Sequence, residues 1–375
     1  MAHRLVGLGF AVIALGWLAP PAMAAPARTL GFVATLFTHA AYDGGAADCP
    51  DGLNASAIDV YLAAAPEAER ARLNAGTEGR RELNRLLSQG ASLTDRMTPN
   101  ACNTPTDYMK PGYFDPNYKT ITRGGVAFGM DLDGATGSEA TATSCAHQPF
   151  TGPAGEAGVD NQWWRLMGCV KYYRPGGDIT EGSPSGIKSG AVSILVEVSG
   201  VDDVRDDPQV EVAFYSSSDP APTGSNGEVM PGGSFQPHEN SRFHAHTRGA
   251  IKNGVLTTEP VEIHLQKKLL IVDTEWFFRD ARLRLEVQAD GTAKGLLAGY
   301  FDVDTAYDTI RQQHMSTAVL GGYTCPSLYV ALHRLADGNR DPESGQCRGI
   351  STAYAIQMVP AFIVHPKTRT ADSGR

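Results

Sequence analysis

The sequence predicts a mainly β protein of the α+β class, built as an antiparallel β-sandwich or a partly closed barrel with helical N- and C-terminal portions. Several short segments alternate between apolar and polar residues, as half-buried strands do. Asn253-Gly254 and Asp290-Gly291 are strong signals for two-residue hairpin turns. The chain has no strand–helix–strand repeat, which argues against a doubly wound parallel sheet.

The composition is that of a folded protein with a sizeable core. The chain has 375 residues, of which 42% are hydrophobic and 19% are charged. This length suits one large domain or two ordinary ones. The formal net charge of -9 argues against a nucleic-acid partner, because such partners bind to a broad basic face. The composition also excludes disordered, collagen-like and coiled-coil classes.

The first 24 residues (1–24) are predicted to be a secretory signal peptide. The apolar stretch Leu5–Leu18 follows a short basic start, and Ala22-Met23-Ala24 supplies the small residues of a cleavage site. A membrane anchor is the alternative, but the stretch is too short to span a bilayer comfortably. We therefore expect an exported protein, periplasmic or extracellular, with no membrane span after cleavage.

Three further segments follow the predicted signal peptide. Residues 25–122 are expected to form a helical and irregular N-terminal portion, 123–302 the β-sandwich core, and 303–375 a helical C-terminal portion packed on the same core. Helical spacing of apolar residues predicts helices at 55–87, 160–173, 305–314 and 327–335. Alternation predicts strands at 124–132, 192–198, 210–214 and 281–287.

The cysteines are expected to form disulfides. There are six: Cys49, Cys102, Cys145, Cys169, Cys325 and Cys347. An even number in an exported protein favours disulfides over zinc, and the sequence has no CxxC pair. Proximity along the chain suggests the pairs Cys49–Cys102, Cys145–Cys169 and Cys325–Cys347.

A calcium site is predicted from two acidic segments. Asp131 and Asp133 lie two residues apart on a predicted strand, so their side chains share a face. A Cys145–Cys169 disulfide would bring Asp160 and Asn161 close to them. Four such hard oxygen ligands suit calcium. Two alternatives stay open: a plain turn at Asp133 with Asp160 as a helix N-cap, and a catalytic carboxylate pair as in glycoside hydrolases.

The same segments resemble a pattern found in uncharacterised secreted bacterial proteins. The matching motifs are Asp131-Leu132-Asp133-Gly134 and Gly158-Val159-Asp160-Asn161-Gln162, together with Cys145 and Cys169. The likeness covers roughly residues 124–302. It implies export and a β-rich fold, and it implies no particular activity.

A histidine group offers an alternative metal site. His244 and His246 alternate on a predicted strand, and His238 lies just upstream. Imidazole ligands suit zinc or copper. The neighbouring Arg242 would repel a cation, so structural or solvent-exposed histidines are the competing interpretation.

Aromatic residues form two runs, Trp163-Trp164 and Trp276-Phe277-Phe278. We expect core positions for them, with stacking on sugars as the alternative.

The function predicted from these features is that of a binding module. The sequence has no complete catalytic motif. We therefore expect an exported, disulfide-stabilised, calcium-binding β protein that binds a small molecule, a glycan or a partner protein. A secreted hydrolase is the alternative, either metal-dependent through the three histidines or carboxylate-based through the acidic segments. A purely structural envelope component is a third possibility.

Overall fold

The structure is a computed structural model, and it describes residues 27–55, 62–63, 65–88, 102–109, 117–121, 125–177, 183–269, 272–312 and 325–366. The predicted signal peptide, 1–24, lies outside these ranges. Within them, no helix is both long enough and apolar enough to cross a membrane.

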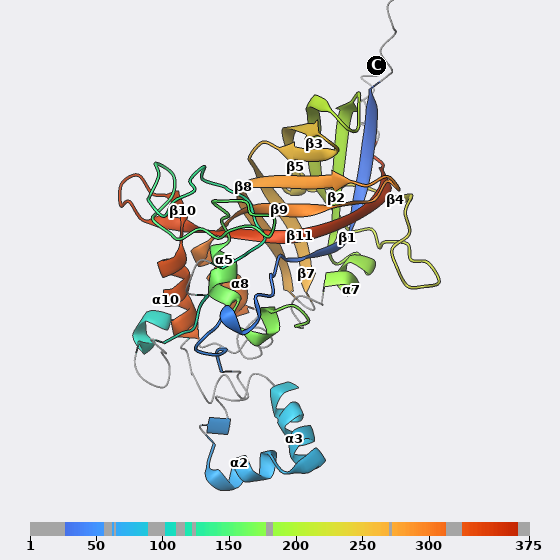
Figure 1. Cartoon of the computed structure of the whole chain (residues 1–375). Helices are drawn as coiled ribbons and strands as arrows, with labels where there is room; N and C mark the ends of the chain where they lie inside the picture. Colours follow the sequence, from blue (N-terminus) through green and yellow to red (C-terminus); the bar gives the residue numbers. More distant parts are fainter. Residues whose placement is uncertain are drawn as a thin grey trace, which may run out of the picture.

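Eight antiparallel strands close into a barrel (Figure 1). In barrel order they are β1 (Arg28–His39), β2 (Ser193–Val201), β3 (Asp207–Ser217), β5 (His244–Lys252), β6 (Val255–Thr258), β8 (Val272–Val287), β9 (Ala293–Asp302) and β11 (Cys347–Ile363). The barrel closes because β1 pairs with β2 on one side and with β11 on the other. The predicted mainly β class is confirmed, and the sheet curls into a barrel rather than forming a sandwich.

The barrel extends beyond the predicted core of 123–302, because its closing strands β1 and β11 lie in the two terminal portions. Neither portion is purely helical. The sequence of β11 does not alternate between apolar and polar residues, because this strand is buried on both faces. Ile350 to Tyr354 are all buried. Ile350 and Tyr354 belong to the main core, whereas Ala353 packs with Met130 and Leu132 in a smaller cluster. A strand covered on both faces has no exposed face to alternate with, and even its polar residues Ser351 and Thr352 are buried.

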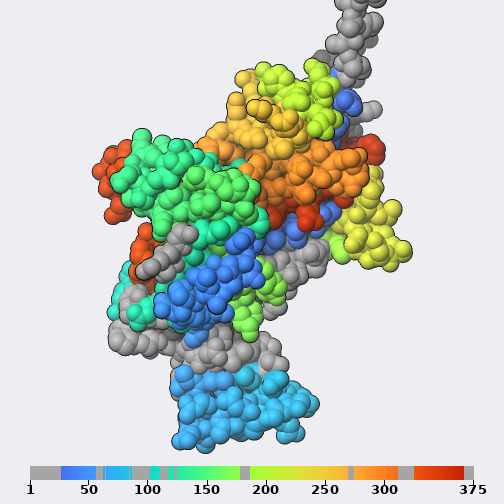
Figure 2. All heavy atoms as spheres, in the orientation of Figure 1, coloured from blue at the N-terminus to red at the C-terminus, as the bar shows by residue number. Residues whose placement is uncertain are grey.

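The remaining elements lie around the barrel. They are η1 (Gly45–Ala47), α2 (Glu67–Leu73), α3 (Gly76–Ser88), η2 (Pro105–Tyr108), α5 (Gln162–Met167), η3 (Lys171–Tyr173), α7 (Ser183–Lys188), β4 (Gly233–Phe235), η4 (Ser241–Phe243), β7 (Val261–Leu269), α8 (Val303–Gln312), α10 (Cys325–Leu335) and β10 (Gly338–Arg340). Helices α5, α8 and α10 gather at one end of the barrel (Figure 1). Figure 2 shows α2 and α3 as a lobe that projects away from it.

The predicted strand at 281–287 is confirmed, and the predicted residues lie on its buried face. Ala281, Leu283 and Leu285 are fully buried in the main core, and the arginines between them are half-buried on the opposite face. The core also contains a cluster of aromatic rings. Phe37 stacks on Tyr354 with 4.6 Å between ring centroids, and Phe278 contacts both.

Both predicted hairpins form, but only the first has the predicted two-residue turn. It joins β5 to β6, and Asn253 and Gly254 have φ angles of 52° and 80°. The second joins β8 to β9 through the longer connection 288–292, in which Gly291 has a φ of 84°. Positive φ at these positions explains why asparagine and glycine occupy them.

Replacing Gly254 with alanine should lower the free energy of unfolding by about 1–2 kcal/mol, the cost of a Cβ in left-handed backbone. A Cβ there would have no heavy atom within 4 Å, so the loss reports conformation alone. Chemical denaturation measures it. Gly137→Ala is the matched control, since this exposed glycine also has open space but no positive φ. Equal losses in both variants would contradict the argument.

Two local predictions are wrong. Residues 125–132, the described part of the predicted strand 124–132, form no strand; Val126 and Met130 make only isolated bridges, and Phe128 is exposed while Ala127 is buried. The predicted helix at 160–173 is shorter, because α5 ends at Met167. Its N-cap is Asn161, whose side chain accepts a hydrogen bond from the Trp164 amide, and not Asp160.

All six cysteines form disulfides, as predicted, but the predicted pairing is wrong. The pairs are Cys49–Cys169, Cys102–Cys325 and Cys145–Cys347. The paired cysteines are 120, 223 and 202 residues apart, because the fold brings distant segments together, so distance along the sequence is a poor guide to pairing.

Candidate functional site

The structure brings two of the predicted calcium ligands, Asp133 and Asp160, together with His147. One donor atom from each of these three side chains lies within 4.8 Å of the other two. Asp337, between α10 and β10, approaches the same place, with its Oδ2 3.9 Å from the His147 Nε2. We call Asp133, His147, Asp160 and Asp337 the Asp–His cluster.

The imidazole of His147 is held from both sides. Its Nε2 lies 2.8 Å from Asp160 Oδ1, and its Nδ1 lies 2.9 Å from the Cys145 carbonyl oxygen. Burial by itself lowers the pKa of His147, but the hydrogen bond to Asp160 and the charge of Asp337 outweigh it and raise the pKa to about 9. With an oxygen acceptor at each nitrogen, the metal-free ring carries both protons.

Two carboxylate oxygens of the cluster lack donors. Asp337 is fully buried; its Oδ1 accepts a hydrogen bond from the Ser351 amide, but its Oδ2 has no hydrogen-bond partner among the described residues. Burial raises the pKa of Asp337 to about 7. Asp133 Oδ2 is also buried without a partner there, whereas its Oδ1 accepts from the Ala135 amide. Unpaired buried oxygens are rare and call for an explanation.

The other two predicted calcium ligands are engaged elsewhere. Asp131 Oδ1 accepts a hydrogen bond of 2.6 Å from the Gly134 amide and closes a turn. The Asn161 side chain caps α5 and also donates to the Phe128 carbonyl. Sequence reasoning missed His147 and Asp337. His147 carries a weak local signal, two residues after Cys145, but nothing local connects Asp337 to this site.

The alternative site at His238, His244 and His246 is not formed. The His244 ring contacts the backbone carbonyl of His238 at 2.6 Å, while the His238 ring accepts a hydrogen bond from the Asn240 amide. His246 packs against the Tyr215 ring. In the part of the chain that the structure describes, three metal-type donors converge only in the Asp–His cluster.

The Asp–His cluster borders a cleft of about 710 Å³, which His147 lines together with Arg165 and the Cys49–Cys169 disulfide. Arg165 is fixed by hydrogen bonds to the Ile121 and Gln148 carbonyl oxygens, so it serves as a wall of the cleft. Of the four members of the cluster, His147 is the one that lines the cleft.

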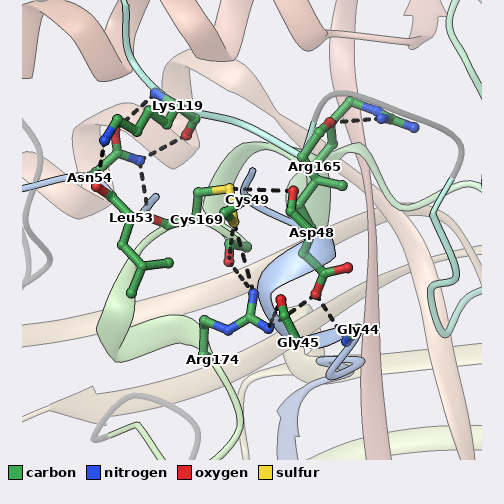
Figure 3. The surroundings of a disulfide bond; sticks show 12 residues. Gly44, Gly45, Asp48, Cys49, Leu53, Asn54, Lys119, Arg165, Cys169 and Arg174 are labelled. Carbon is green, nitrogen blue, oxygen red and sulfur yellow. Dashed lines mark hydrogen bonds and ion pairs between the residues drawn. A yellow bond between two sulfur atoms is a disulfide. The ribbon is translucent and has the colours of Figure 1, made fainter. Parts of the chain in front are cut away.

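Figure 3 shows how the wall at this disulfide is held. Arg174 donates to the Gly168 carbonyl at 2.9 Å and to the buried carboxylate of Asp48 at 3.0 Å (Figure 3). Asn54 ties the Cys49 loop to Lys119 by two further hydrogen bonds.

A second cavity, of about 80 Å³, lies at the end of the barrel. We call it the barrel-end cavity. Its walls are mainly aromatic, and they include Trp163, Trp276, Phe277, Phe301 and Tyr354. Its polar lining includes His39, Lys267, Glu275 and Asp302. The prediction of aromatic core positions is therefore correct for Trp163, Trp164 and Phe278, which are buried, while Trp276 and Phe277 are half-buried at the cavity.

A scan of protein-family models and searches of curated proteins and of solved structures found no match to this chain. The fold and the site alone therefore define its class. It is a closed antiparallel barrel, cross-linked by three disulfides, with an Asp–His cluster over β9 and β11 and a cavity at one end.

Proposed function

We propose that the protein is an exported binding protein that holds one divalent metal ion in the Asp–His cluster. The observation that carries the metal is the convergence of the His147 Nε2 with oxygens of Asp133 and Asp160 within 4.8 Å. Up to three carboxylates surround one imidazole there, and a cation balances their charge. Export is supported by the three disulfides, which persist in oxidising compartments.

The donor set favours zinc or manganese over the calcium expected from the sequence. Calcium takes six to eight oxygen ligands, but two of its four predicted ligands are engaged elsewhere. A nitrogen donor with two or three carboxylates suits a transition metal better. The Cys145 carbonyl also supports this choice, because a ligating histidine usually donates its other ring N–H to such an acceptor. A metal ion would take the place of the Nε2 proton.

Metal addition to chelator-treated protein should raise the melting temperature. At 100 times its Kd, an ion that binds only the folded state adds about 2.7 kcal/mol of stability. We expect zinc or manganese to give this shift and calcium to give less. Elemental analysis of the untreated protein should find close to one equivalent of the metal.

Asp133→Asn is the test variant, because the amide oxygen can still accept from the Ala135 amide while the charge at Oδ2 is lost. We expect at least about tenfold weaker metal binding. Asp131→Asn is the matched control, since its carboxylate closes a turn beside the cluster, and it should bind metal like the unchanged protein. No retained metal and no melting shift with any of the three ions would refute the proposal. A preference for calcium would overturn the choice of zinc or manganese.

One observation favours a hydrolase as the second candidate function. His147 lines the 710 Å³ cleft, so a metal in the cluster would be reachable by a substrate. Hydrolysis of p-nitrophenyl acetate or phosphate by zinc-loaded protein, lost in Asp133→Asn and kept in Asp131→Asn, would favour this candidate. Absence of turnover in protein with a full complement of metal would favour the binding protein.

A further inference from the structure

We propose that the barrel-end cavity binds a small organic carboxylate, with the Lys267 ammonium as its charged anchor. The cavity lies among the β7–β8 hairpin, α5, α8 and the ends of β1 and β9. None of its residues belongs to the Asp–His cluster, so this inference stands independently of the proposed metal.

The positive charge of Lys267 is uncompensated in the described structure. Its Nζ lies 4.6 Å from the centroid of the Trp276 ring, and no described carboxylate forms an ion pair with it. Glu275 lines the same cavity, but its carboxylate is bound by Arg242 at 2.6 and 2.8 Å and by His264 at 3.1 Å. An unpaired ammonium against aromatic rings attracts an anion strongly, because water screens it poorly there.

Asp302, the other carboxylate of the lining, is also engaged. Its Oδ1 accepts hydrogen bonds of 2.9 Å from the amide and the hydroxyl of Thr305, and so it caps α8. Both acidic groups of the cavity therefore have partners of their own, and neither neutralises the Lys267 ammonium.

Two ring nitrogens of residues that line the cavity are buried without a partner, and neither atom has accessible surface of its own. Trp163 is 5% exposed, and its indole N–H has no hydrogen-bond partner among the described residues. The same holds for the buried Nδ1 of His39. An indole nitrogen can only donate, so Trp163 requires an acceptor.

The His39 ring, which stacks on Trp163, carries no charge. Burial, and then the charge of Lys267, lower the pKa of His39 to about 3, so the ring is neutral. Its Nε2 lies 3.0 Å from the Tyr354 hydroxyl, which itself accepts a hydrogen bond from Trp276.

An ammonium without a counter-ion among the described residues thus lines the cavity, and the complementary ligand carries a negative charge. The volume of about 80 Å³ accommodates a few water molecules or a small carboxylate. Flat aromatic walls favour a planar group over a tetrahedral one. We therefore infer a monocarboxylate with a short apolar body as the ligand class, rather than phosphate.

The test is a calorimetric titration of the full protein with formate, acetate, propionate and benzoate, with phosphate and chloride as anion controls. Quenching of tryptophan fluorescence follows the same event, since Trp163 and Trp276 line the cavity. We expect at least one carboxylate to bind at millimolar concentration or better, and phosphate not to bind.

Lys267→Met keeps the length of the side chain and removes its charge, and it should weaken carboxylate binding by about 10- to 100-fold, the value of a charge-assisted hydrogen bond. Its melting temperature should be unchanged or higher, because a half-buried charge has been removed, so loss of binding is separable from misfolding. Lys268→Met is the matched control, because Lys268 is the exposed neighbour on the same strand.

The affinity should also depend on pH. Burial lowers the pKa of Lys267 to about 8, so binding should weaken as the pH rises through that value. The other titratable groups at the cavity are His39 on β1, Glu275 on β8 and Asp302 at the end of β9, together with the tyrosine hydroxyls of Tyr173 and Tyr354. His39, with its pKa near 3, is neutral throughout this window, and the two carboxylates are bound to partners.

Three outcomes would overturn the inference: equal binding by Lys267→Met and the unchanged protein, no binding of any carboxylate at millimolar concentration, or phosphate bound as well as carboxylate. The second would mean that water alone fills the cavity. Asp133→Asn should retain carboxylate binding and Lys267→Met should retain metal binding, so failure of one proposal is distinguishable from failure of the other.

Discussion

Removing the Cys49–Cys169 disulfide by replacing both cysteines with alanine should lower the free energy of unfolding by about 5 kcal/mol. The two cysteines are 120 residues apart, and a cross-link over a loop of that length restricts the unfolded chain strongly. Guanidinium unfolding under oxidising conditions measures the loss. We expect the variant to remain folded at low temperature, since the Arg174 and Asn54 contacts still hold the loop (Figure 3).

The same substitution at Cys145–Cys347 is the matched comparison. This pair spans 202 residues, so the chain-entropy model expects a similar or slightly larger loss. Its sulfur-bearing residues are half-buried, however, whereas Cys49 and Cys169 are buried. Equal losses would show that chain entropy dominates, and a larger loss at Cys49–Cys169 would show a packing contribution. A loss below about 1 kcal/mol at Cys49–Cys169 would contradict the prediction.

Phe278→Ala should lower the free energy of unfolding by about 3–5 kcal/mol, the usual cost of deleting a fully buried phenylalanine side chain. The ring is 0% exposed, and its centroid lies 4.8 Å from that of Phe301 and 5.4 Å from that of Tyr354. These neighbours belong to different barrel strands, so they cannot easily close the space that the ring leaves.

The control for Phe278 is Phe362→Ala. Phe362 lies on β11 and is 66% exposed, so the same change there should alter the free energy of unfolding by no more than about 0.5 kcal/mol. Urea or guanidinium unfolding of both variants gives the comparison. Similar losses in the two variants would mean that the buried aromatic cluster contributes no more to the free energy of unfolding than an exposed phenylalanine does.

Some features of this fold could be predicted because their causes are local. The alternation of Ala281, Leu283 and Leu285 reflects a strand with one buried face, and Asn253-Gly254 reflects a turn that needs positive φ. By contrast, the sequence of 124–132 alternates, but its described part, 125–132, is not a strand. Its pairing with Thr151 and Asp160 is limited to isolated bridges at Val126 and Met130, and a strand needs a continuous partner.

The residues of the candidate sites also divide into those with a local sequence signal and those without one. Asp133 and Asp160 could be selected from the sequence because acidic residues beside glycine and asparagine are a recognisable local pattern. His147 and Asp337 could not, since 190 residues separate them along the chain. The barrel-end cavity was still harder to predict from the sequence, because Lys267 lies among alternating strand residues and belongs to no motif.

By itself the sequence determined the strand-rich class, two hairpins, the use of all six cysteines in disulfides and two of the four members of the Asp–His cluster. Only the tertiary structure decided which cysteines pair, which carboxylates meet His147 and which side chains surround the Lys267 ammonium. The physical reason is that the fold brings distant segments together. Pairing β1 with β11, for example, joins segments from opposite ends of the chain, and contacts of that kind depend on the whole fold rather than on any local run of residues.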